Sequence, residues 1–581
     1  MHSRLSLAAA LLACGATAAI QAAEIIEPII ITATRTAQTV DETLASVTVI
    51  GREDIEQSQA VSVVELIQSR SVGVDLTRNG GLGTNTSLLL RGSNSNHLLV
   101  LIDGVRVNSA IDGGFKWANL PLEQIERIEI VRGPRSTLYG SDAIGGVVQI
   151  FTRKDTGFHA TLGGGSYNTL RTEVGSGGAL GAGRYHINAG YLESGGFSAA
   201  KPGTYGYEPD DDGYVNTNLG AGFSHPLGDG GTLTLNLLHS DGEVETDAGS
   251  SSQRNDSGSV TLDWAGSEHW QQTLTLGHAA DRYETNDGYE VRSLRHSASW
   301  QHDVQISDRG LLSAGIDYVT EDGESKGSYD EDIHTGALFA QLQWSGERLD
   351  LLLGARADDH SGFGRQDTGS VTLGGKLGGG RLYASYGSAF KAPTFLQRYY
   401  PTYGNPDLEP EESVTAELGY RLDALQVSLF DTRVDNLIEF TFPAGYSNVS
   451  RARLKGAELE YGHAVGAWQL HGGLTLQQAE DTDSGEPLLR RAEKKLIFTA
   501  RGPLTTRADL GIEVSYTGSR PDRNDVELAS YTLLNLTGTY RLGEKWSLNG
   551  RIENLLDEDY ELADGYNTPG TSAYLTLSYR E

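Results

Sequence analysis

Three acidic stretches of this sequence carry the side chains best suited to binding a metal ion. Glu208–Gly213 reads EPDDDG, and the segments Asp241–Asp256 and Glu321–Asp332 place further carboxylates among glycines and serines. Carboxylate and carbonyl oxygens are the ligands that calcium prefers, and it takes about six to eight of them. The spacing therefore predicts calcium binding by acidic loops, and the alternative is that these loops are simply solvated.

Motifs of catalytic chemistry are weak or missing in the sequence. Gly323–Gly327 reads GESKG, which fits the G-x-S-x-G pattern of hydrolases, but it lies among acids and glycines rather than between a strand and a helix. The 14 histidines form no H-E-x-x-H cluster, and the sequence has no Walker phosphate loop. We therefore predict that the protein is not an enzyme and hydrolyses no nucleotide.

Charge and composition narrow the class of protein. The formal net charge is -31 at pH 7, which repels nucleic acid and excludes it as a partner. Cys14 is the only cysteine, so neither a disulfide framework nor a thiolate metal site is available. The 73 glycines and 26 tyrosines fit many short strands and turns better than long helices.

The first 23 residues are predicted to be a signal peptide. Arg4 precedes the small and apolar run Leu5–Ile20, and Ala22-Ala23 ends the segment. We expect cleavage after Ala23, and the alternative is a lipoprotein signal that ends at Cys14. No later apolar run reaches the roughly 18–20 residues that a membrane helix needs. An exported chain of this kind either stays soluble or enters an outer membrane as a β-barrel.

Residues from about Ser46 to Lys154 have the pattern of a compact α/β unit. Apolar runs end at turn signals such as Asp103-Gly104 and Gly133-Pro134, which is typical of buried strands. The predicted elements are strands at Ser46–Ile50, Val74–Leu76, Leu98–Ile102 and Ile125–Val131, and helical turns from Asp54 and over Ser62–Gln68.

The chain after about Phe158 alternates apolar and polar residues with period two. Leu233, Leu235 and Leu237 alternate with threonines and an asparagine, and the same pattern recurs over Leu338–Trp344, Leu534–Leu542 and Ala573–Tyr579. One apolar and one polar face are typical of a transmembrane β-barrel. At about 19–20 residues per strand, the last ~425 residues supply about 22 antiparallel strands, a size with a plugged lumen. A soluble sandwich has the same period but fewer strands.

Several motifs resemble those of the TonB-dependent outer-membrane receptors, and within them the cobalamin transporters of the BtuB type. The resemblance covers nearly the whole chain after the signal. Its motifs are IIITATR (29–35), NGGLGTNTSLLLRGSNSNHLLVLIDGVRVN (79–108), IVRGPRSTLYGSDAIGGVV (130–148), FKAPTFLQRYYPTYGNPDLEPEES (390–413), RARLKGAELE (451–460), PLLRRAEKK (487–495) and ENLLDEDYE (553–561).

The resemblance implies a domain order and a motor. A signal peptide at 1–23 and a TonB-box segment at 24–35 would precede an α/β plug domain at 36–155, which lies inside the lumen of a barrel at 156–581. On the residues alone, the β-prone segment 24–35 could equally be a first plug strand or an arm that adds to a partner's sheet. TonB, with its inner-membrane energising complex, would bind Glu27, Pro28, Ile29, Ile30, Ile31, Thr32, Ala33 and Thr34.

The resemblance also implies binding residues. Ligand contacts carried over from the family are Asn85, Ser87, Asn94, Asp112 and Gly113 in the apical plug loops. Calcium ligands carried over in the same way are Glu208, Asp210, Asp212, Asp247 and Asp256.

The predicted plug has three arginines within otherwise mainly apolar stretches of sequence: Arg91, Arg132 and Arg135. A buried arginine needs a partner, and its planar fork suits carboxylates. We expect these arginines to anchor the plug to acidic groups on the barrel wall.

The function implied by the resemblance is active uptake of cobalamin across the outer membrane, with outer-membrane lipid around the barrel. Alternatives are a siderophore receptor, a haem receptor, or a passive porin or adhesin barrel. The absence of histidine from Phe390–Leu408 argues against haem. A porin or adhesin would lack both the plug and IIITATR.

Overall fold

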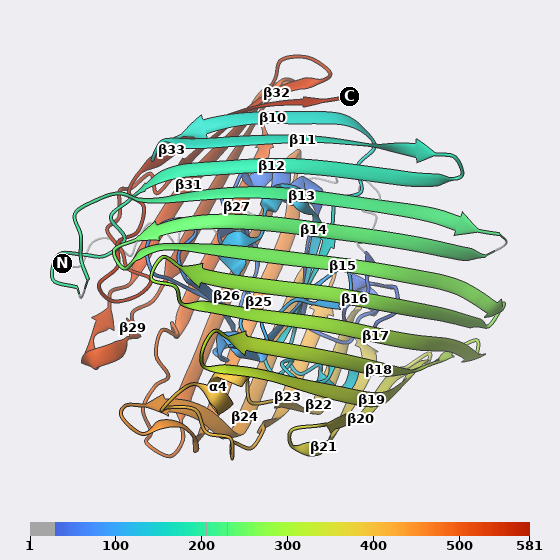
Figure 1. The fold of residues 1–581 in the computed structure, drawn as a ribbon. Helices are drawn as coiled ribbons and strands as arrows, with labels where there is room; N and C mark the ends of the chain where they lie inside the picture. The colour runs from blue at the N-terminus through green and yellow to red at the C-terminus, as the bar shows by residue number, and fades with distance from the viewer. Residues whose placement is uncertain (1–28, 205, 229) are drawn as a thin grey trace.

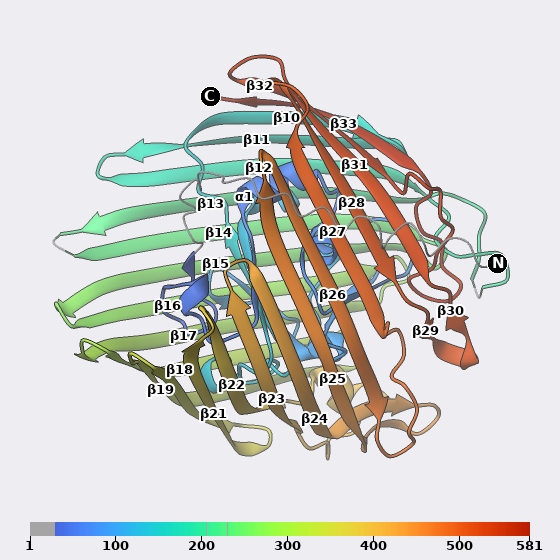
Figure 2. The ribbon, with the colours of Figure 1, turned by 180° about the vertical axis from the view of Figure 1, so that it is seen from behind.

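The computed structural model describes residues 29–204, 206–228 and 230–581. The predicted signal peptide, Glu27 and Pro28 lie outside the described residues. The described chain forms a wide barrel with a smaller α/β unit in its lumen (Figures 1 and 2). The predicted fold class is therefore confirmed.

The barrel is a closed antiparallel sheet of 22 strands, in which the last strand pairs with the first. The strands are β10 (Gly157–Gly165), β11 (Thr169–Leu180), β12 (Gly183–Phe197), β13 (Asp212–Leu227), β14 (Gly231–Thr246), β15 (Gly249–Ser267), β16 (Trp270–Thr285), β17 (Glu290–Ser307), β18 (Gly310–Ser325), β19 (Tyr329–Ser345), β20 (Leu349–His360), β21 (Gly364–Leu377), β22 (Gly380–Lys391), β23 (Glu411–Leu422), β24 (Leu425–Thr441), β25 (Gly445–Val465), β26 (Trp468–Asp481), β27 (Lys494–Pro503), β28 (Ala508–Thr517), β31 (Tyr531–Arg541), β32 (Trp546–Glu553) and β33 (Ser572–Arg580).

The two faces of the barrel follow from the alternation of side chains along each strand. On β14, Leu237 is 64% exposed and Leu238 is 7% exposed. Leu338 on β19 and Leu575 on β33 are exposed in the same way, whereas Phe339 is buried toward the lumen. The outer face therefore carries an apolar row that fits lipid, as the period-two pattern predicts.

The connections between strands differ at the two ends of the barrel. Long connections at 198–211, 392–410, 482–493 and 554–571 lie at one end, and turns such as 181–182 and 228–230 lie at the other. Helix α4 (Phe395–Tyr399) and the short strands β29 (Arg520–Pro521) and β30 (Glu527–Leu528) belong to the end with long connections (Figure 1). Outer-membrane barrels direct their long loops outward, so this is the outer end.

Two of the three predicted acidic loops are mainly strand. Residues 241–256 are divided between β14 and β15 around a turn at 247–248, and residues 321–332 between β18 and β19 around 326–328. The loop prediction was wrong there because polar strands can continue past the apolar band while cross-strand hydrogen bonds satisfy their backbones. Residues 208–211 do lie in a long connection.

The plug is a five-stranded sheet with a hairpin and helices packed on it. The sheet order is β3 (Val47–Ile50), β8 (Ile125–Arg132), β9 (Gly146–Thr152), β6 (Leu98–Ile102) and β7 (Val105–Arg106). Strands β4 (Val74–Arg78) and β5 (Thr86–Leu90) form the hairpin, and the helices are α1 (Arg52–Ser58), α2 (Val63–Arg70) and α3 (Ser136–Tyr139). None of the helices in the described part of the chain is long and apolar enough to span a membrane.

The core of the plug explains these elements. Val63, Leu66 and Ile67 recur at helical spacing on α2, and all are buried with Ile128 and Ile130 of β8. The last plug strand ends at Thr152, and the first barrel strand begins at Gly157.

The described part of the predicted TonB-box segment forms a small sheet of its own. Strand β1 (Ile29–Ile30) pairs with β2 (Gln38–Thr39), apart from the five-stranded sheet. It is therefore not a strand of the main plug sheet, which was one of the two alternatives.

Candidate functional site at the plug apex

A cavity of about 870 Å³ lies between the plug apex and the inner wall of the barrel near its outer end. The plug contributes residues from the turn after β4 and from the connection after β7, and the barrel contributes the upper parts of β14–β17. Pockets for small molecules have volumes of about 300–1,000 Å³. The cavity can therefore enclose a large ligand.

The connection after β7 is held in shape by Asn108. Its side-chain oxygen accepts a hydrogen bond from the Val100 backbone N–H at 2.7 Å, and its amide donates to the carbonyl oxygens of Leu98 and Gly113, both at 3.0 Å. These bonds fold residues 109–114 into a compact loop that faces the cavity.

Asp112 and Lys116 form a charged pair within that loop. The Lys116 ammonium lies 2.9 Å from Asp112 Oδ2, and the Gly114 backbone N–H donates to Asp112 Oδ1 at 2.9 Å. Burial raises the pKa of the Asp112 carboxyl, but Lys116 and Gly114 together hold the pKa below its ordinary value. Asp112 is therefore an ionised acceptor on the cavity wall.

The predicted ligand contacts divide into two groups in the structure. Asn85 and Asp112 line the cavity. Gly113 faces a smaller cavity below the loop instead, and Ser87 lies inside β5 opposite Thr77. Asn94 accepts a hydrogen bond from Arg491 at 2.6 Å and does not line the cavity. The structure therefore places Asn85 and Asp112 at the large cavity and Ser87, Asn94 and Gly113 outside its lining, and ligand contact by all five stays a prediction.

The sequence analysis missed the aromatic side of the cavity. Tyr283 and Tyr289 line it with ring centroids 6.4 Å apart, and Tyr566 joins them from the connection after β32. The turn Asn286-Asp287-Gly288 was the signal that could have placed Tyr289 at the start of a strand. These rings supply flat apolar surface beside the polar plug loops.

The acidic residues predicted to bind calcium are partly brought together. Asp247 accepts hydrogen bonds from the backbone N–H of Glu208 at 2.7 Å and of Ala200 at 3.0 Å, and Asp212 accepts from that of Ala199. These carboxylates fold the connection 198–211 against the β14–β15 turn. Their donor chemistry fits calcium, but across the described residues no group of three or more candidate side chains is arranged to hold a metal ion.

Asp256 does not belong with the other acidic residues. It lies on β15, seven residues beyond Gly249, which is about 23 Å along an extended strand. Its carboxylate contacts His239 Nδ1 at 2.6 Å on the neighbouring strand. The structure therefore places Asp256 away from the other predicted calcium ligands, because the predicted loop is strand here.

Two of the predicted anchoring arginines contact carboxylates of the barrel wall. Arg91 Nη2 lies 2.7 Å from Glu458, and Arg91 Nη1 lies 2.9 Å from Glu417. Arg132 shares Glu458 at 3.3 Å and contacts Glu460 at 3.3 Å. All these groups except Glu460 are almost completely buried.

Arg135 differs from the prediction. Its guanidinium contacts the Pro134 carbonyl oxygen at 3.4 Å and has no carboxylate within ion-pair distance among the described residues. Arg91 already occupies Glu417, the carboxylate that acts on Arg135 electrostatically. Burial lowers the pKa of Arg135 from its ordinary value.

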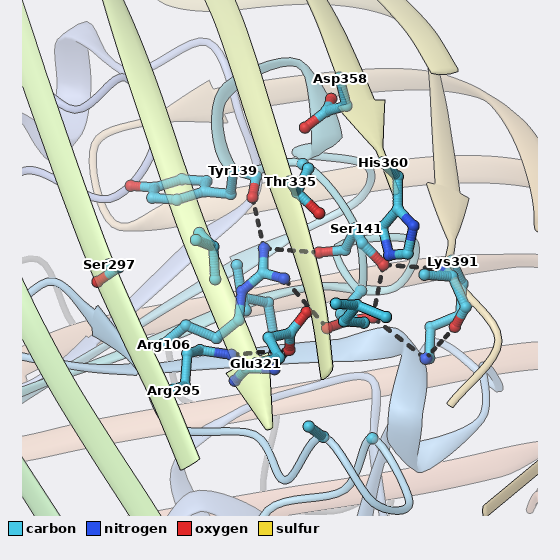
Figure 3. Close-up of a pocket in the computed structure, with 18 of the residues that line it drawn as sticks. Arg106, Tyr139, Ser141, Arg295, Ser297, Glu321, Thr335, Asp358, His360 and Lys391 are labelled. Carbon is cyan, nitrogen blue, oxygen red and sulfur yellow. Dashed lines mark hydrogen bonds and ion pairs between the residues drawn. The ribbon is translucent and has the colours of Figure 1, made fainter. Parts of the chain in front are cut away.

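A smaller cavity of about 120 Å³ continues below the apical loop between the plug and the wall (Figure 3). Arg106 donates to the carbonyl oxygens of Tyr139 at 2.6 Å and Ser141 at 3.0 Å. Asp142 lies 3.2 Å from Lys391 and 3.4 Å from Arg106. The smaller cavity therefore lies between the apical loop and the loop after α3.

The fold has counterparts in known proteins. A family model described as TonB dependent receptor-like, beta-barrel matches residues 151–555, and a model of the TonB-dependent Receptor Plug Domain matches residues 39–147. The chain belongs to the TonB-dependent receptors. The receptor is accordingly an outer-membrane β-barrel with an N-terminal plug, in a family of receptors rather than enzymes.

Relatives of the receptor are similar over nearly their full length. It is 31% identical over 591 residues to the vitamin B12 transporter BtuB of Vibrio cholerae serotype O1, with 95% of each chain covered. It is 30% identical over 588 residues to the vitamin B12 transporter BtuB of Photobacterium profundum, again with 95% of each chain covered.

Solved structures share the fold of the receptor. A single-residue mutant of the ferric enterobactin receptor PfeA of Pseudomonas aeruginosa has a TM-score of 0.82 at 20% identity and covers 95% of this chain and 100% of its own. The siderophore receptor PirA of Acinetobacter baumannii has a TM-score of 0.78 at 19% identity, with 92% and 98% covered. Identities this low establish the architecture alone.

Proposed function

We propose that the receptor takes up cobalamin across the outer membrane with energy delivered through TonB, and that it catalyses no reaction. The observation that carries the proposal is the 31% identity to a vitamin B12 transporter over 95% of both chains. Ile29–Thr34 would be the described part of the segment that TonB binds, and the inner-membrane energising complex would supply the force.

The chemistry of the large cavity supports a corrinoid. Amides of Asn79, Asn85 and Gln253 line it beside the rings of Tyr289 and Tyr566. A corrinoid presents many side-chain amides around a large flat ring system. Amide and aromatic groups complement both features.

The charge of the cavity argues against the siderophore alternative. Among the described residues that line it, Lys116 is the only cationic side chain, and Asp112 pairs with it. Asp247 and Asp281 add negative charge. Ferric complexes of catecholate siderophores are anions, and such a wall would repel them.

Calcium binding is proposed for the acidic residues at the outer end. Glu208, Asp210, Asp212 and Asp247 lie in or beside the connection 198–211 and the β14–β15 turn. Their carboxylates provide the hard oxygen ligands that calcium takes. Bound calcium would fix the connection beside the cavity and cancel part of its negative charge.

Calorimetry on the detergent-purified receptor tests both proposals. Cyanocobalamin should bind tightly in calcium and more weakly in excess chelator. Equal binding with and without chelator would support cobalamin as the ligand and reject the proposed calcium site. The lack of binding in both conditions would reject cobalamin and favour a ferric siderophore, which is then titrated in the same way.

A further inference from the structure

The described part of the TonB-box segment makes three hydrogen bonds to one buried carboxylate. Glu129 lies on β8 of the plug and is completely buried. Its Oε2 accepts hydrogen bonds from the backbone N–H of Ile31 at 3.0 Å, from the backbone N–H of Thr32 at 2.9 Å, and from the Thr32 hydroxyl at 2.6 Å. One carboxylate of the plug thus accepts the hydrogen bonds of three donor groups in the middle of the segment.

Glu129 is itself held in place from within the plug. Arg127 Nη2 lies 2.9 Å from Glu129 Oε1, and the Arg127 guanidinium lies 4.2 Å from the centre of the Phe151 ring. The ion pair and the ring orient the carboxylate toward the segment.

The plug also contacts Thr32 through Tyr139, whose hydroxyl donates to the Thr32 carbonyl oxygen at 3.0 Å. Ile30 packs in an apolar cluster with Val47 and Val131 of the plug. Beyond Thr32 the barrel wall contacts the segment. Gln341 donates to the Thr34 carbonyl oxygen at 3.0 Å, and Gln301 donates to the Arg35 carbonyl oxygen at 3.2 Å. Glu129 therefore supplies three of the hydrogen bonds that hold the segment against the plug.

We propose that Glu129 is the positioning residue that keeps the TonB-box segment docked in the resting receptor. Without this carboxylate, the backbone N–H groups of half-exposed Ile31 and buried Thr32 would lose their acceptor, which disfavours the docked state. When the segment leaves, water can replace each bond, so the contact is reversible. The functional meaning of docking rests on the proposed role of TonB.

Cysteine labelling of the full chain in detergent tests the proposal. Ala33→Cys places a thiol at a buried position of the segment, and the natural cysteine, Cys14, lies in the predicted signal peptide that cleavage removes. We expect Glu129→Gln to raise the labelling rate by a water-soluble maleimide about tenfold, because hydrogen bonds to a charged acceptor are the strong ones. Glu129→Asp, which keeps the charge, should give a smaller increase.

Two controls separate docking from general loosening of the plug. Glu126→Gln is the matched variant, since Glu126 is on the same strand and makes no hydrogen bond to the segment among the described residues. Ser58→Cys reports on the plug interior, where Ser58 is buried. An unchanged rate at position 33, or an equal increase at positions 33 and 58, would overturn the proposal. The labelling needs neither TonB nor ligand, so its result is independent of whether cobalamin uptake is confirmed.

Discussion

At the scale of single residues, the receptor joins plug and barrel through buried charges that compensate one another. Glu458 is the centre of this network because both Arg91 and Arg132 contact it. Arg91 also lies 4.5 Å from the centre of the Phe430 ring. Such pairs fix position more than they add stability, since removing charges from water is costly.

Removal of Glu458 should loosen the plug. Glu458→Ala leaves two buried guanidinium groups short of a partner, and breaking a buried pair in this way costs about 3–5 kcal/mol. We expect a loss of that size in the free energy of plug unfolding, measured by urea titration with tryptophan fluorescence that includes buried Trp117. Glu412→Ala, at an exposed position of the neighbouring wall, should change little. Equal effects of both substitutions would contradict this role.

Asp142 should make plug docking sensitive to acid. Burial raises the pKa of its carboxyl, but Lys391 and Arg106 outweigh burial and lower the pKa from 3.8 to about 2. A depressed pKa contributes stability above the ordinary value, and this contribution is lost as pH falls from about 4 through about 2. It amounts to about 2 kcal/mol. Asp142→Asn should flatten the dependence of unfolding free energy on pH in this window, and an unchanged profile would reject the assignment.

At the scale of elements, the cavity is made where strand ends and plug loops meet. The turn at 286–289 places Tyr289 on the cavity wall, and Asn108 shapes the plug loop opposite it. Because plug loops and barrel strands each form part of the cavity wall, the cavity keeps its shape only while the plug stays in place inside the barrel.

Tyr289 should contribute to ligand binding. Tyr289→Ala removes a ring from the cavity, and we expect a loss of more than about 1 kcal/mol of binding free energy, seen as a roughly tenfold higher Kd for cyanocobalamin in calorimetry. Tyr386→Ala, on the exposed outer face of β22, is the matched control and should leave Kd unchanged. A Kd unaffected by Tyr289→Ala would place the ligand elsewhere.

The proposed calcium effect belongs to the connection 198–211. Asp247→Asn removes the charge and keeps an acceptor for only one of the two backbone N–H groups, since Ala200 donates to Oδ2 and Glu208 to Oδ1. We expect this variant to lose most of the calcium dependence of cobalamin binding, measured as the ratio of Kd values with and without chelator. Asp332→Asn, at an exposed position of β19, should retain the wild-type ratio. If both variants retain it, calcium acts at another place or not at all.

At the scale of the whole molecule, the plug fills the lumen of the closed barrel, and the large cavity and the TonB-box segment lie in different regions of it. The ligand cavity lies near the outer end, whereas Glu129 holds the TonB-box segment through a different face of the plug. The plug lies between the cavity and the TonB-box segment. The plug domain matches a family model of TonB-dependent receptors.

Deletion of residues 24–35 should separate the two functions. The truncated receptor keeps every strand of the barrel and of the five-stranded plug sheet. We therefore expect the Kd for cyanocobalamin, measured by calorimetry, to stay close to that of the wild type, while uptake by cells falls to background. Uptake that survives the deletion would indicate a passive route.

The sequence by itself determined the barrel, the family and four of the plug strands (β3, β4, β6 and β8), but not β5, β7 and β9. Alternation of side chains is a local property of a strand, so Leu233, Leu235 and Leu237 were enough to predict an outward apolar row. Strand Leu98–Ile102 has the predicted bounds, and Ile125–Arg132 differs from the prediction by one residue. Leu98–Ile102 is a continuous apolar run, Ile125–Arg132 intersperses apolar with charged residues, and turn signals follow both, so a single stretch of sequence contains the information.

Only the tertiary structure decided which polar groups meet. Asn94 contacts Arg491 and Ile31 contacts Glu129, pairs that are 397 and 98 positions apart in the chain. Asp256 lies apart from the other acidic residues because it pairs with His239 far along β15. Arg135 has no ion pair with Glu417 because Arg91 binds that carboxylate. These outcomes depend on how the barrel closes and how the plug seats within it, and no local pattern contains that information.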